Sequence, residues 1–451
     1  MRIADLADRR VAVWGLGREG RATLAALHAR LPQLPLTVFC SEAEAPVLQE
    51  ALAVITITPD AAALSAFDVV IKSPGISAYR PEILLAQHAG TRFTSGTALW
   101  FAEHPEARVI AVTGTKGKST VSALIAHMLR VLGKKVALAG NIGLPLLELL
   151  DPPQAPDWWV IELSSFQTRE VARVELAVIN NLYEEHLDWH GSRERYADDK
   201  LALAMVAETV LVNAALPELR ARLGAHSRRI EFGNDGGWHV APDAIMRGSE
   251  GVFDLARSPL PGAHNAMNLC AALAALDAIG EDSVAAAPAI ADFHPLPHRL
   301  QTLGERDGLT WIDDSIATTP QATLAALASL RGRAISVLVG GYERGLDWRP
   351  FAEHMRDTPP FAIVTMGANG ARISAMLREV GGDYRLESTG TLAHAVALAR
   401  ASTPLHGVVL LSPGAPSFDA FRDYAERGAQ FARLGGFHGD PVGTIDGMGI
   451  A

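Results

Sequence analysis

The stretch Val109-Ile-Ala-Val-Thr-Gly-Thr-Lys-Gly-Lys-Ser-Thr120 decides the fold, because it reads as a buried strand, a glycine-rich turn and the start of a helix. The helical pattern continues as VSALIAHMLRVLG. Glycine-rich turns between a strand and a helix wrap phosphate with backbone N–H groups, and the helix N-terminus adds a favourable field. The sequence therefore predicts a triphosphate site on a parallel α/β sheet.

This loop departs from the common phosphate-loop pattern. Val112 stands where the first glycine of G-x-x-x-x-G-K-[ST] belongs, so the fit is to a shorter form that begins at Gly114. Lys118 would place a cation on the outer phosphates, and the Ser119 hydroxyl would reach Mg²⁺. A plain glycine and lysine turn is the alternative. The residues expected to contact ATP here are Gly114, Thr115, Lys116, Gly117, Lys118, Ser119 and Thr120.

A second glycine-rich turn lies near the N-terminus. Gly15, Gly17 and Gly20 satisfy G-x-G-x-x-G after the apolar run Val11–Trp14, a pattern typical of dinucleotide-binding folds. A dehydrogenase would carry an acidic residue at the end of the next strand, where Cys40 stands. The later phosphate loop also disfavours a redox enzyme. A tight turn without a ligand is one alternative, and binding of a nucleotide diphosphate is the favoured interpretation.

Strands alternating with helices along the whole chain predict an α/β fold with parallel sheets. Three domains are expected, at residues 1–96, 97–296 and 297–434. The glycine-rich segment 435–451 is weakly patterned, so we expect a flexible tail. Further strands are predicted within LTVFC, DVVIKSPGI, Trp158–Ile161, Ala177–Ile179, Thr310–Asp313, Ala334–Val339 and Val408–Leu411.

Composition limits the class of protein. The chain has 451 residues, 49% of them hydrophobic and 20% charged, as in a globular protein that is larger than one core. No apolar run is long enough to span a bilayer, and no signal peptide is evident. A net charge of −10 argues against nucleic-acid binding. Cys40 and Cys270 do not make a disulfide framework, so a cytoplasmic protein is expected.

Several separate motifs carry a family resemblance over nearly the whole chain. They are GLGREG, KSPGI, VTGTKGKST, GNIGLP, IELSSFQ, EEHLDWHGS, YADDK, GAHNAMN, LPHRLQ, DDSIATT and LLSPGAPSFDAF. In this order they resemble the Mur ligase family, most closely its UDP-N-acetylmuramoyl-alanine:glutamate ligases (the MurD type). Folylpolyglutamate synthases share the phosphate loop but lack the GLGREG domain and the last motif.

The resemblance implies a Rossmann-like N-terminal domain for the UDP substrate, a P-loop central ATPase domain and a Rossmann-like C-terminal domain for the amino acid. It implies ATP-dependent transfer of the γ-phosphate to the carboxylate of UDP-N-acetylmuramoyl-L-alanine. Attack by the amine of glutamate on the acyl phosphate then gives an amide, ADP and phosphate, in peptidoglycan precursor synthesis. The implied partners are these small molecules, without nucleic acid or membrane, and a monomer is expected.

The resemblance also assigns residues to the chemistry. Lys118, His186 and Lys200 would be catalytic, and Ser119 and Glu162 would serve Mg²⁺ on the ATP phosphates. Glu162, His186 and Lys200 would surround a second Mg²⁺. Mg²⁺ prefers oxygen ligands, so the cationic ammonium of a lysine is an unfavourable neighbour for it. In the family, carbamylation of this lysine by CO₂ converts it into an anion that bears oxygens. A solvated lysine and an ordinary loop histidine are the alternatives for Lys200 and His186.

The remaining implied contacts extend over all three domains. Asn265 and Asn268 match residues near adenine, although an asparagine pair in a helix also suits capping. Arg299 and Asp314 match residues that hold ATP from the third domain. The expected contacts of the UDP substrate are Gly15, Leu16, Gly17, Arg18, Ser73, Gly75, Asn141, Ser164 and Gln167.

The amino-acid pocket is where this chain departs from D-glutamate enzymes. Its expected residues are Thr318, Arg344, Ser417, Phe418 and Tyr424. Ile316 replaces a lysine, and Arg344 stands where another lysine is usual. Arginine binds carboxylate as a planar fork and lysine as a point charge, so both glutamate carboxylates would shift. The pattern resembles the L-glutamate branch, which works with a separate epimerase. A D-glutamate ligase, a ligase for another amino acid and a non-catalytic nucleotide-binding relative remain alternatives.

Overall fold

The computed structural model describes residues 1–41, 53–55, 58–183, 185–224, 228–343, 345–438 and 448–450. These residues form two compact units, and each is described by itself. The first comprises Met1–Leu260, His264–Phe293 and the described residues 448–450, and the second comprises Pro261–Ala263 and the described residues from His294 to His438. No helix among the described residues combines the length and hydrophobicity needed to cross a bilayer.

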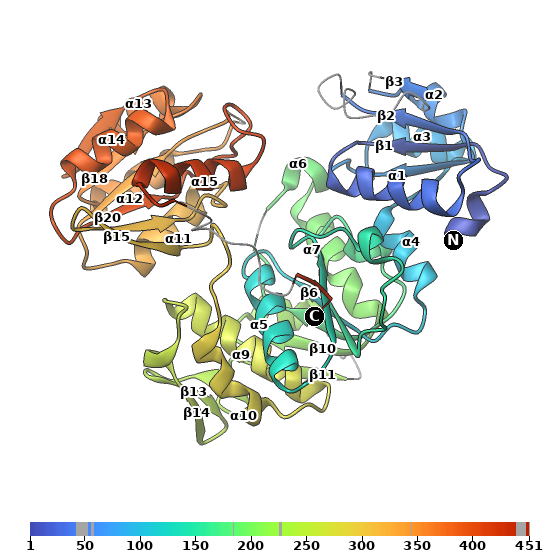
Figure 1. The fold of residues 1–451 in the computed structure, drawn as a ribbon, viewed down its shortest axis with the longest axis horizontal. Coiled ribbons are helices and arrows are strands. Elements are labelled where there is room, and N and C mark those ends of the chain that lie inside the picture. The colour runs from blue at the N-terminus through green and yellow to red at the C-terminus, as the bar shows by residue number, and fades with distance from the viewer. Residues whose placement is uncertain are drawn as a thin grey trace. The chain divides into compact units, whose positions relative to one another are not determined.

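The first unit begins with a five-stranded parallel sheet in the order β3-β2-β1-β4-β5, drawn in blue in Figure 1. Its strands are β1 (Val11–Trp14), β2 (Leu36–Phe39), β3 (Ala53–Ile55), β4 (Val69–Lys72) and β5 (Arg92–Thr94). Its helices are η1 (Ile3–Leu6), α1 (Arg18–Arg30), α2 (Ala61–Ser65), α3 (Pro81–His88) and α4 (Gly96–Glu103). The strands predicted from VAVW, LTVFC and DVVIK are confirmed.

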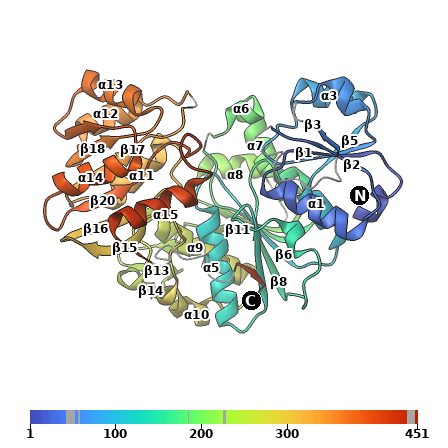
Figure 2. The same ribbon diagram turned by 45° about the horizontal axis from the view of Figure 1, so that its top comes forward.

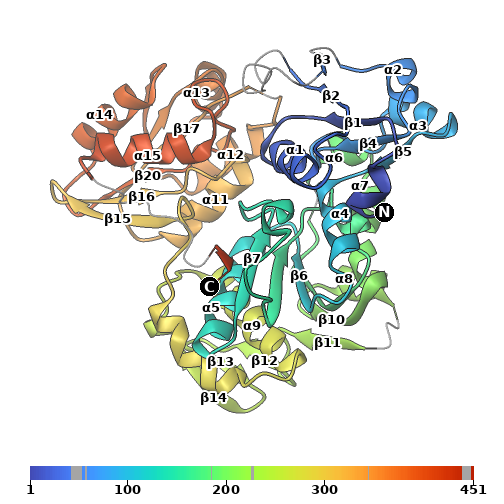
Figure 3. The ribbon, with the colours of Figure 1, turned by 45° about the vertical axis from the view of Figure 1, so that its right-hand side comes forward.

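Alternating side chains of β1 and β4 enter cores on opposite faces of this sheet. Leu27 of α1 packs with Val11 and Val13 on one face, and Ile83 of α3 packs with Ala12 on the other. Figure 3 shows α1 against β1 and β2. A parallel sheet covered on both faces is the doubly wound arrangement expected for a Rossmann-like domain.

A seven-stranded sheet follows in the same unit, in the order β11-β10-β9-β6-β8-β7-β21. Its strands are β6 (Val109–Thr113), β7 (Val136–Gly140), β8 (Trp158–Glu162), β9 (Val174–Ile179), β10 (Ala207–Asn213), β11 (Arg229–Phe232) and β21 (Gly449–Ile450). The connecting helices are α5 (Lys118–Val131), η3 (Leu146–Leu149), η4 (Thr168–Glu170), α6 (Leu187–His190), α7 (Arg193–Leu201), η5 (Ala202–Val206) and α8 (Pro217–Leu223).

Strand β6 lies in the middle of this sheet and positions the phosphate loop. It pairs in parallel with β8 on one side and β9 on the other, so the carboxyl ends of three strands meet. Helix α5 packs against β7 and β8. The other face of this seven-stranded sheet packs against α1 and α4, in a hydrophobic core that includes Trp100, Ala111 and Ile161. The first two sheets thus share one continuous hydrophobic core.

The segment 435–451, expected to be a flexible tail, is described only near its two ends. Helix α15 (Tyr424–Gly435) extends into the segment, and the ring of Phe437 packs against Trp311. Gly449 and Ile450 form β21, which pairs antiparallel with β7. The unpaired backbone groups of an edge strand such as β7 offer hydrogen-bond partners to a short strand of this kind. Residues 439–447 and 451 lie outside the described residues.

The first unit ends with a small antiparallel sheet and a group of helices. The sheet has the order β12 (Trp238–Val240), β13 (Ala244–Arg247) and β14 (Glu250–Asp254). Helix α9 (Ala263–Ala278) is almost wholly buried along the part that carries the asparagine pair. The other helices of this part of the chain are η6 (Leu255–Arg257), α10 (Ser283–Ala286) and η7 (Ala287–Asp292).

The second unit is a six-stranded sheet in the order β15-β16-β20-β17-β18-β19. Its strands are β15 (Gln301–Arg306), β16 (Leu309–Asp313), β17 (Ile335–Val339), β18 (Ala362–Thr365), β19 (Arg385–Ser388) and β20 (Val408–Leu411). Its helices are α11 (Pro320–Ser329), α12 (Arg349–Asp357), α13 (Gly370–Val380), α14 (Leu392–Ser402) and α15. β15 is antiparallel and the other strands are parallel.

The two faces of this sheet have separate cores. Helices α11, α12 and α13 pack on one face, and α14 and α15 lie side by side on the other (Figure 2). Strand β20 follows β19 in sequence but lies between β16 and β17, so the chain reverses direction across the sheet. In such folds the crevice at the carboxyl ends near this reversal is the usual place for a ligand.

Candidate active site

The phosphate loop is built on two glycines in backbone conformations that other residues rarely adopt. Gly114 has φ +151°, and Gly117 has φ +79° and caps the N-terminus of α5. The first turn of α5 directs its amides along the helix axis toward this loop, which favours an anion there. Lys118 Nζ donates to the Thr115 carbonyl at 3.1 Å. The loop therefore combines a helix N-terminus with a lysine ammonium.

Two asparagines at the end of β9 hold the loop in shape. Asn181 Oδ1 accepts the backbone amides of Thr115 and Lys116, both at 2.8 Å. Asn180 Nδ2 donates to the Lys116 carbonyl at 3.1 Å. These amides, which the sequence assigned to phosphate, are held by a side chain. The strand next to β6 thus sets the conformation of the loop.

Gly117 is the position in this loop that tolerates no side chain. A Cβ there would lie 2.4 Å from Asn268 Oδ1 and 2.6 Å from Asn180 Nδ2. We expect Gly117→Ala to lower stability by about 1–3 kcal/mol and to weaken ATP binding, because left-handed backbone strain adds to the clash. Thermal unfolding and calorimetric ATP titration measure both effects.

Gly133→Ala is the matched control for this substitution. Gly133 also has φ +79°, but no atom would contact its Cβ within 4 Å. The control carries the backbone strain without the clash and without any contact to the loop. Equal ATP affinity in the two variants would contradict the assignment of the Gly117 contacts.

Glu162, at the end of β8, lies beside the start of α5. Its buried carboxylate accepts from Ser119 Oγ at 2.6 Å and from Asn141 Nδ2 at 2.8 Å. A hydroxyl and a carboxylate oxygen in contact are donors of the type that Mg²⁺ prefers. The described residues contain no group of three or more His, Cys, Asp or Glu side chains arranged as a metal site. The oxygens of Ser119 and Glu162 are of the type that Mg²⁺ accepts, but two protein ligands alone do not make a complete metal site.

Lys200, near the end of α7, is brought to the phosphate loop. Its Nζ donates to the Gly114 carbonyl at 2.9 Å, and the side chain is 2% exposed. This burial excludes the alternative of a solvated lysine. Burial, with the nearby charge of Lys118, holds the pKa of Lys200 well below its usual value against the opposite effect of Glu185 and Glu162. A neutral amine is therefore favoured at this position.

His186 lies at the N-terminus of α6 with left-handed backbone angles, φ 56° and ψ 38°. Its ring centroid is 5.0 Å from that of Phe166, and its Nε2 is 3.8 Å from Glu185 Oε2. Glu185 also pairs with Lys116 at 2.7 Å. Burial opposes ionisation of Glu185, but Lys116 outweighs it and holds the pKa of this carboxyl below its usual value. Glu185 is thus the acidic neighbour of both His186 and Lys116 of the phosphate loop.

The asparagine pair of α9 reaches the same loop. Asn268 Oδ1 accepts from Asn180 Nδ2 at 2.9 Å, and Asn268 Nδ2 donates to Asn265 Oδ1 at 3.2 Å. Both side chains are buried, Asn265 in the first turn of α9 and Asn268 one turn further along. The printed bonds of this pair thus join Asn265 to Asn268, and Asn268 to Asn180 beside the phosphate loop.

The residues expected to contact the UDP substrate form a series of contacts in the first unit. Ser73 Oγ donates to the Gly15 carbonyl at 3.1 Å. Arg18 donates to the Gly143 carbonyl at 2.9 Å, in the loop that carries Asn141. Gln167 accepts from Ser164 Oγ at 2.8 Å and donates to Thr97 Oγ1 at 3.1 Å. Leu16 is buried, whereas a Cβ added at Gly17 or Gly75 would meet no atom within 4 Å.

Two residues expected to hold ATP lie in the second unit. Asp314 is buried, accepts from Ser412 Oγ at 2.7 Å and from the Leu300 amide at 3.2 Å. Burial raises the pKa of Asp314 to about 7. Arg299 precedes Leu300, and its amide donates to the Leu296 carbonyl at 3.3 Å. His298 and Leu300 on either side of Arg299 both have positive φ, so this segment is held in a strained shape.

The expected amino-acid residues follow β16 and β20. Ser417 is buried, Phe418 is 67% exposed and its ring lies 6.4 Å from that of Tyr342. The Tyr424 carbonyl accepts from Ser315 Oγ at 2.8 Å, and Thr318 is half-buried. Arg344 lies outside the described residues. Thr318, Ser417 and Phe418 are thus on loops that follow the neighbouring strands β16 and β20, and Tyr424 begins helix α15.

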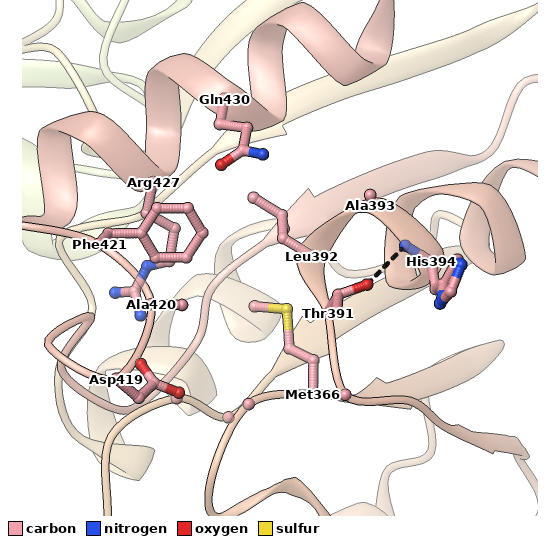
Figure 4. Close-up of a pocket in the computed structure, with 14 residues that line it drawn as sticks. Met366, Thr391, Leu392, Ala393, His394, Asp419, Ala420, Phe421, Arg427 and Gln430 are labelled. Carbon is pink, nitrogen blue, oxygen red and sulfur yellow. Dashed lines mark hydrogen bonds between the residues drawn. The ribbon is translucent and has the colours of Figure 1, made fainter.

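A cavity of about 510 Å³ lies beside these loops (Figure 4). Asp419, Phe421 and Arg427 line one side, and Thr391 and His394 at the start of α14 line the other. Of the four expected amino-acid residues that the structure describes, none is among its lining residues, although Gly340 and Gly341 of the loop before Arg344 are. The cavity therefore lies beside these four residues.

Sequence reasoning missed three residues that shape these loops. Asn180 and Asn181 follow a buried strand next to β6, and their position after an apolar run is a signal that could have found them. Arg427 is fully buried and donates to Ser315 Oγ and to the carbonyls of Ser315, Ala415 and Pro416. Burial lowers the pKa of Arg427 to about 10. Its place one turn before Phe431 on α15 marks the buried helix face.

Comparison with known proteins agrees with this arrangement. The chain matches the model of the Mur ligase middle domain over residues 112–276 and that of the Mur ligase glutamate ligase domain over residues 298–414. Among solved structures it resembles the UDP-N-acetylmuramate-alanine ligase MurC of Thermotoga maritima, with TM-score 0.62 and 20% identity over 94% of this chain and 98% of that one. The fold match over nearly the full length confirms the predicted three-domain α/β architecture.

Relatives with much higher identity extend over the whole length. The chain is 51% identical to a protein of Xanthomonas euvesicatoria and 52% identical to one of Xylella fastidiosa, with all of each chain covered. A relative from Salinispora tropica is 42% identical over 96% of this chain and 98% of its own. All three are named UDP-N-acetylmuramoyl-L-alanine--L-glutamate ligase. Because both family models and full-length relatives match, the chain belongs to the Mur ligase family.

Proposed function

We propose that this protein joins L-glutamate to UDP-N-acetylmuramoyl-L-alanine with cleavage of ATP to ADP and phosphate, in peptidoglycan precursor synthesis. The observation that carries the proposal is the meeting of Lys118, Ser119, Glu162 and Lys200 around one glycine-rich loop. The names of the full-length relatives support the substrates.

The arrangement suits transfer of a phosphoryl group to a carboxylate. A carboxylate is a poor electrophile, because it is anionic and its leaving group would be oxide. Phosphorylation supplies a good leaving group, after which the amine of glutamate attacks the acyl carbon and phosphate departs. Two anions must approach each other in the first step, so cationic groups are needed. Lys118 and the N-terminus of α5 provide positive potential at this place.

We assign Ser119 and Glu162 to Mg²⁺, because their oxygens are already in contact. The ion would neutralise charge on the transferring phosphoryl group. We further assign Lys200 to carbamylation by CO₂. Its burial favours the neutral amine, which attacks CO₂ and loses a proton to give an anionic carbamate with two oxygens. His186 would complete this environment from the start of α6.

The choice of L-glutamate rests on the amino-acid loops and on the relatives. Ile316 removes one cation from the second unit, and the relatives that share half of this sequence are named for L-glutamate. Such an enzyme would need a separate epimerase to supply the D-glutamyl product. We place this function in the cytoplasm, where UDP-linked precursors and ATP are available, and propose that a monomer suffices for it.

The test supplies the purified protein with UDP-N-acetylmuramoyl-L-alanine, ATP and each glutamate enantiomer separately, and measures phosphate release. We expect turnover with L-glutamate and at least about tenfold lower kcat/KM with D-glutamate, a difference of about 1.4 kcal/mol in transition-state binding. Turnover with D-glutamate alone would overturn the choice of enantiomer. Absence of phosphate release with either enantiomer and with other amino acids would favour the non-catalytic alternative.

A further inference from the structure

The backbone of His186 is held in a conformation that costs free energy. Left-handed angles at a residue with a side chain persist only where the surroundings enforce them. The His186 carbonyl accepts the amides of Trp189 at 3.0 Å and His190 at 3.1 Å, which closes the short turn of α6. The backbone of His186 is therefore tied to the positions of Trp189 and His190 in the same turn.

His190 is fully buried and bonds at both ring nitrogens. Its Nδ1 lies 2.6 Å from Asp199 Oδ2, and its Nε2 lies 2.9 Å from Ser165 Oγ. A carboxylate can only accept, so Nδ1 carries a proton. The same ring thus joins α6 to Asp199, which directly precedes Lys200, and to Ser165, which directly follows Ser164.

Asp199 gathers donors from three further places. Tyr79 OH donates to Oδ1 at 2.6 Å, Arg169 Nε also donates to this carboxylate, and the Asp199 backbone carbonyl accepts from Thr168 Oγ1 at 2.6 Å. Burial alone would raise the pKa of Asp199, but the bonds from His190, Tyr79 and Arg169 outweigh it and lower that pKa below its usual value. The carboxylate stays charged and fixes all its donors.

Tyr79 belongs to the loop that also carries Ser73 and Gly75, so this contact joins the first sheet to the second. Trp189 adds two more links to the same loop. Its Nε1 donates to the Pro74 carbonyl at 3.1 Å, and its own carbonyl accepts from Ser77 Oγ at 2.5 Å.

The ring of Trp189 carries this link on to His186. It stacks on Phe166 at 4.6 Å between centroids, and Phe166 contacts His186. It also meets the Tyr79 ring edge-on at 5.7 Å. The loop that carries Ser73 and Gly75 is therefore connected to His186 through aromatic contacts and to Lys200 through Asp199.

We propose that Tyr79, Trp189, His190 and Asp199 form a docking latch. Through these four residues, the loop that carries Ser73 and Gly75 packs against α6 and α7. We propose that this packing fixes the positions of His186 and Lys200. Its members are positioning residues, since they touch the groups assigned to chemistry and not the reacting atoms. This inference rests on the proposed function, because it assigns His186 and Lys200 to the ligase reaction.

The test compares the full-length enzyme with Asp199→Asn, Tyr79→Phe and the double variant. Asp198→Asn is the matched control, because Asp198 is the exposed neighbour on the same helix and undergoes the same chemical change. We expect each latch variant to lower kcat/KM for the sugar nucleotide about tenfold, as for loss of a hydrogen bond to a charged group. The KM for ATP should stay within about twofold, since Asn180 and Asn181 hold the phosphate loop separately.

The double variant, Tyr79→Phe with Asp199→Asn, shows whether the two substitutions lower kcat/KM through loss of the same hydrogen bond or through independent effects. If Tyr79 and Asp199 act through the bond between them, the double variant should fall within about threefold of Asp199→Asn, whereas independent effects would multiply to about a hundredfold. His190→Asn and His190→Phe extend the test. The asparagine amide can still donate to Asp199 and should retain more activity than phenylalanine, which keeps the ring but donates nothing.

The outcomes distinguish the latch from the proposed function and from a purely structural role. Wild-type turnover, measured first, tests the function. Calorimetric affinity for the sugar nucleotide, which needs no turnover, should fall about tenfold in Asp199→Asn and stay unchanged in Asp198→Asn. Equal kinetics and affinity in these two variants would overturn the latch. A fully multiplicative double variant, or a loss of kcat with every KM unchanged, would overturn it as well.

Discussion

Replacing Lys118 with alanine is expected to lower kcat at least about a thousandfold, because charge is removed where the transferring phosphoryl group is most anionic. Lys118 opens α5, and its ammonium lies over the loop at the Thr115 carbonyl. The helix N-terminus remains in the variant, so nucleotide binding should weaken less than turnover. Phosphate release and calorimetric binding of ADP measure the two effects separately.

Lys135→Ala is the control for this variant. Lys135 is an exposed lysine whose ammonium bonds to Gln154 at 2.7 Å, away from the loop. Its replacement should leave turnover within about twofold, as for most surface substitutions. Retention of more than a tenth of wild-type kcat in Lys118→Ala would remove Lys118 from the chemical step.

Replacing Lys200 with alanine is expected to lower kcat by about a thousandfold as well, and added short carboxylates such as acetate or propionate should restore part of it. The variant leaves a buried space beside the Gly114 carbonyl. A small carboxylate entering this space would supply the two oxygens that a carbamate supplies in the wild type. The measurement is phosphate release over a series of carboxylate concentrations.

Lys200→Met is the companion variant. Methionine lacks the amine but fills most of the lysine volume, so it should lose activity equally and should not respond to carboxylates. The same rescue in both variants would show a bulk salt effect. Inactivity of Lys200→Ala at every carboxylate concentration would weigh against the carbamate, and a wild-type enzyme indifferent to removal of CO₂ would contradict it.

The sequence predicted the two glycine-rich loops, but it did not predict which side chains hold them in shape. The glycine turns at Gly15 and Gly117 were recognisable because their chemistry lies in a few consecutive residues. The asparagine that holds the amides of Thr115 and Lys116 is 66 residues from Thr115 and arrives only because β9 pairs with β6. Strand order brings such partners together, and no local pattern encodes it.

The same limit explains Lys200 and the latch. The segment YADDK reads as the polar part of a helix, and the burial of Asp199 and Lys200 could not be predicted from it. The local sequence pattern carries no sign of this burial, because the residues that donate hydrogen bonds to Asp199, Tyr79 and Arg169, belong to other elements. Tertiary contacts therefore changed the expected environment of two charged side chains without changing the helix.

What the sequence by itself determined is the order of strands and helices, the two phosphate-type turns and the residue types available for phosphoryl transfer. These follow from periodicity and from backbone requirements of consecutive residues. The tertiary structure alone decided that Lys200 is buried on the Gly114 carbonyl, that Asp199 joins two sheets and that the chain's last strand completes the edge at β7. Burial and long-range pairing depend on how whole elements pack, so a linear pattern cannot specify them.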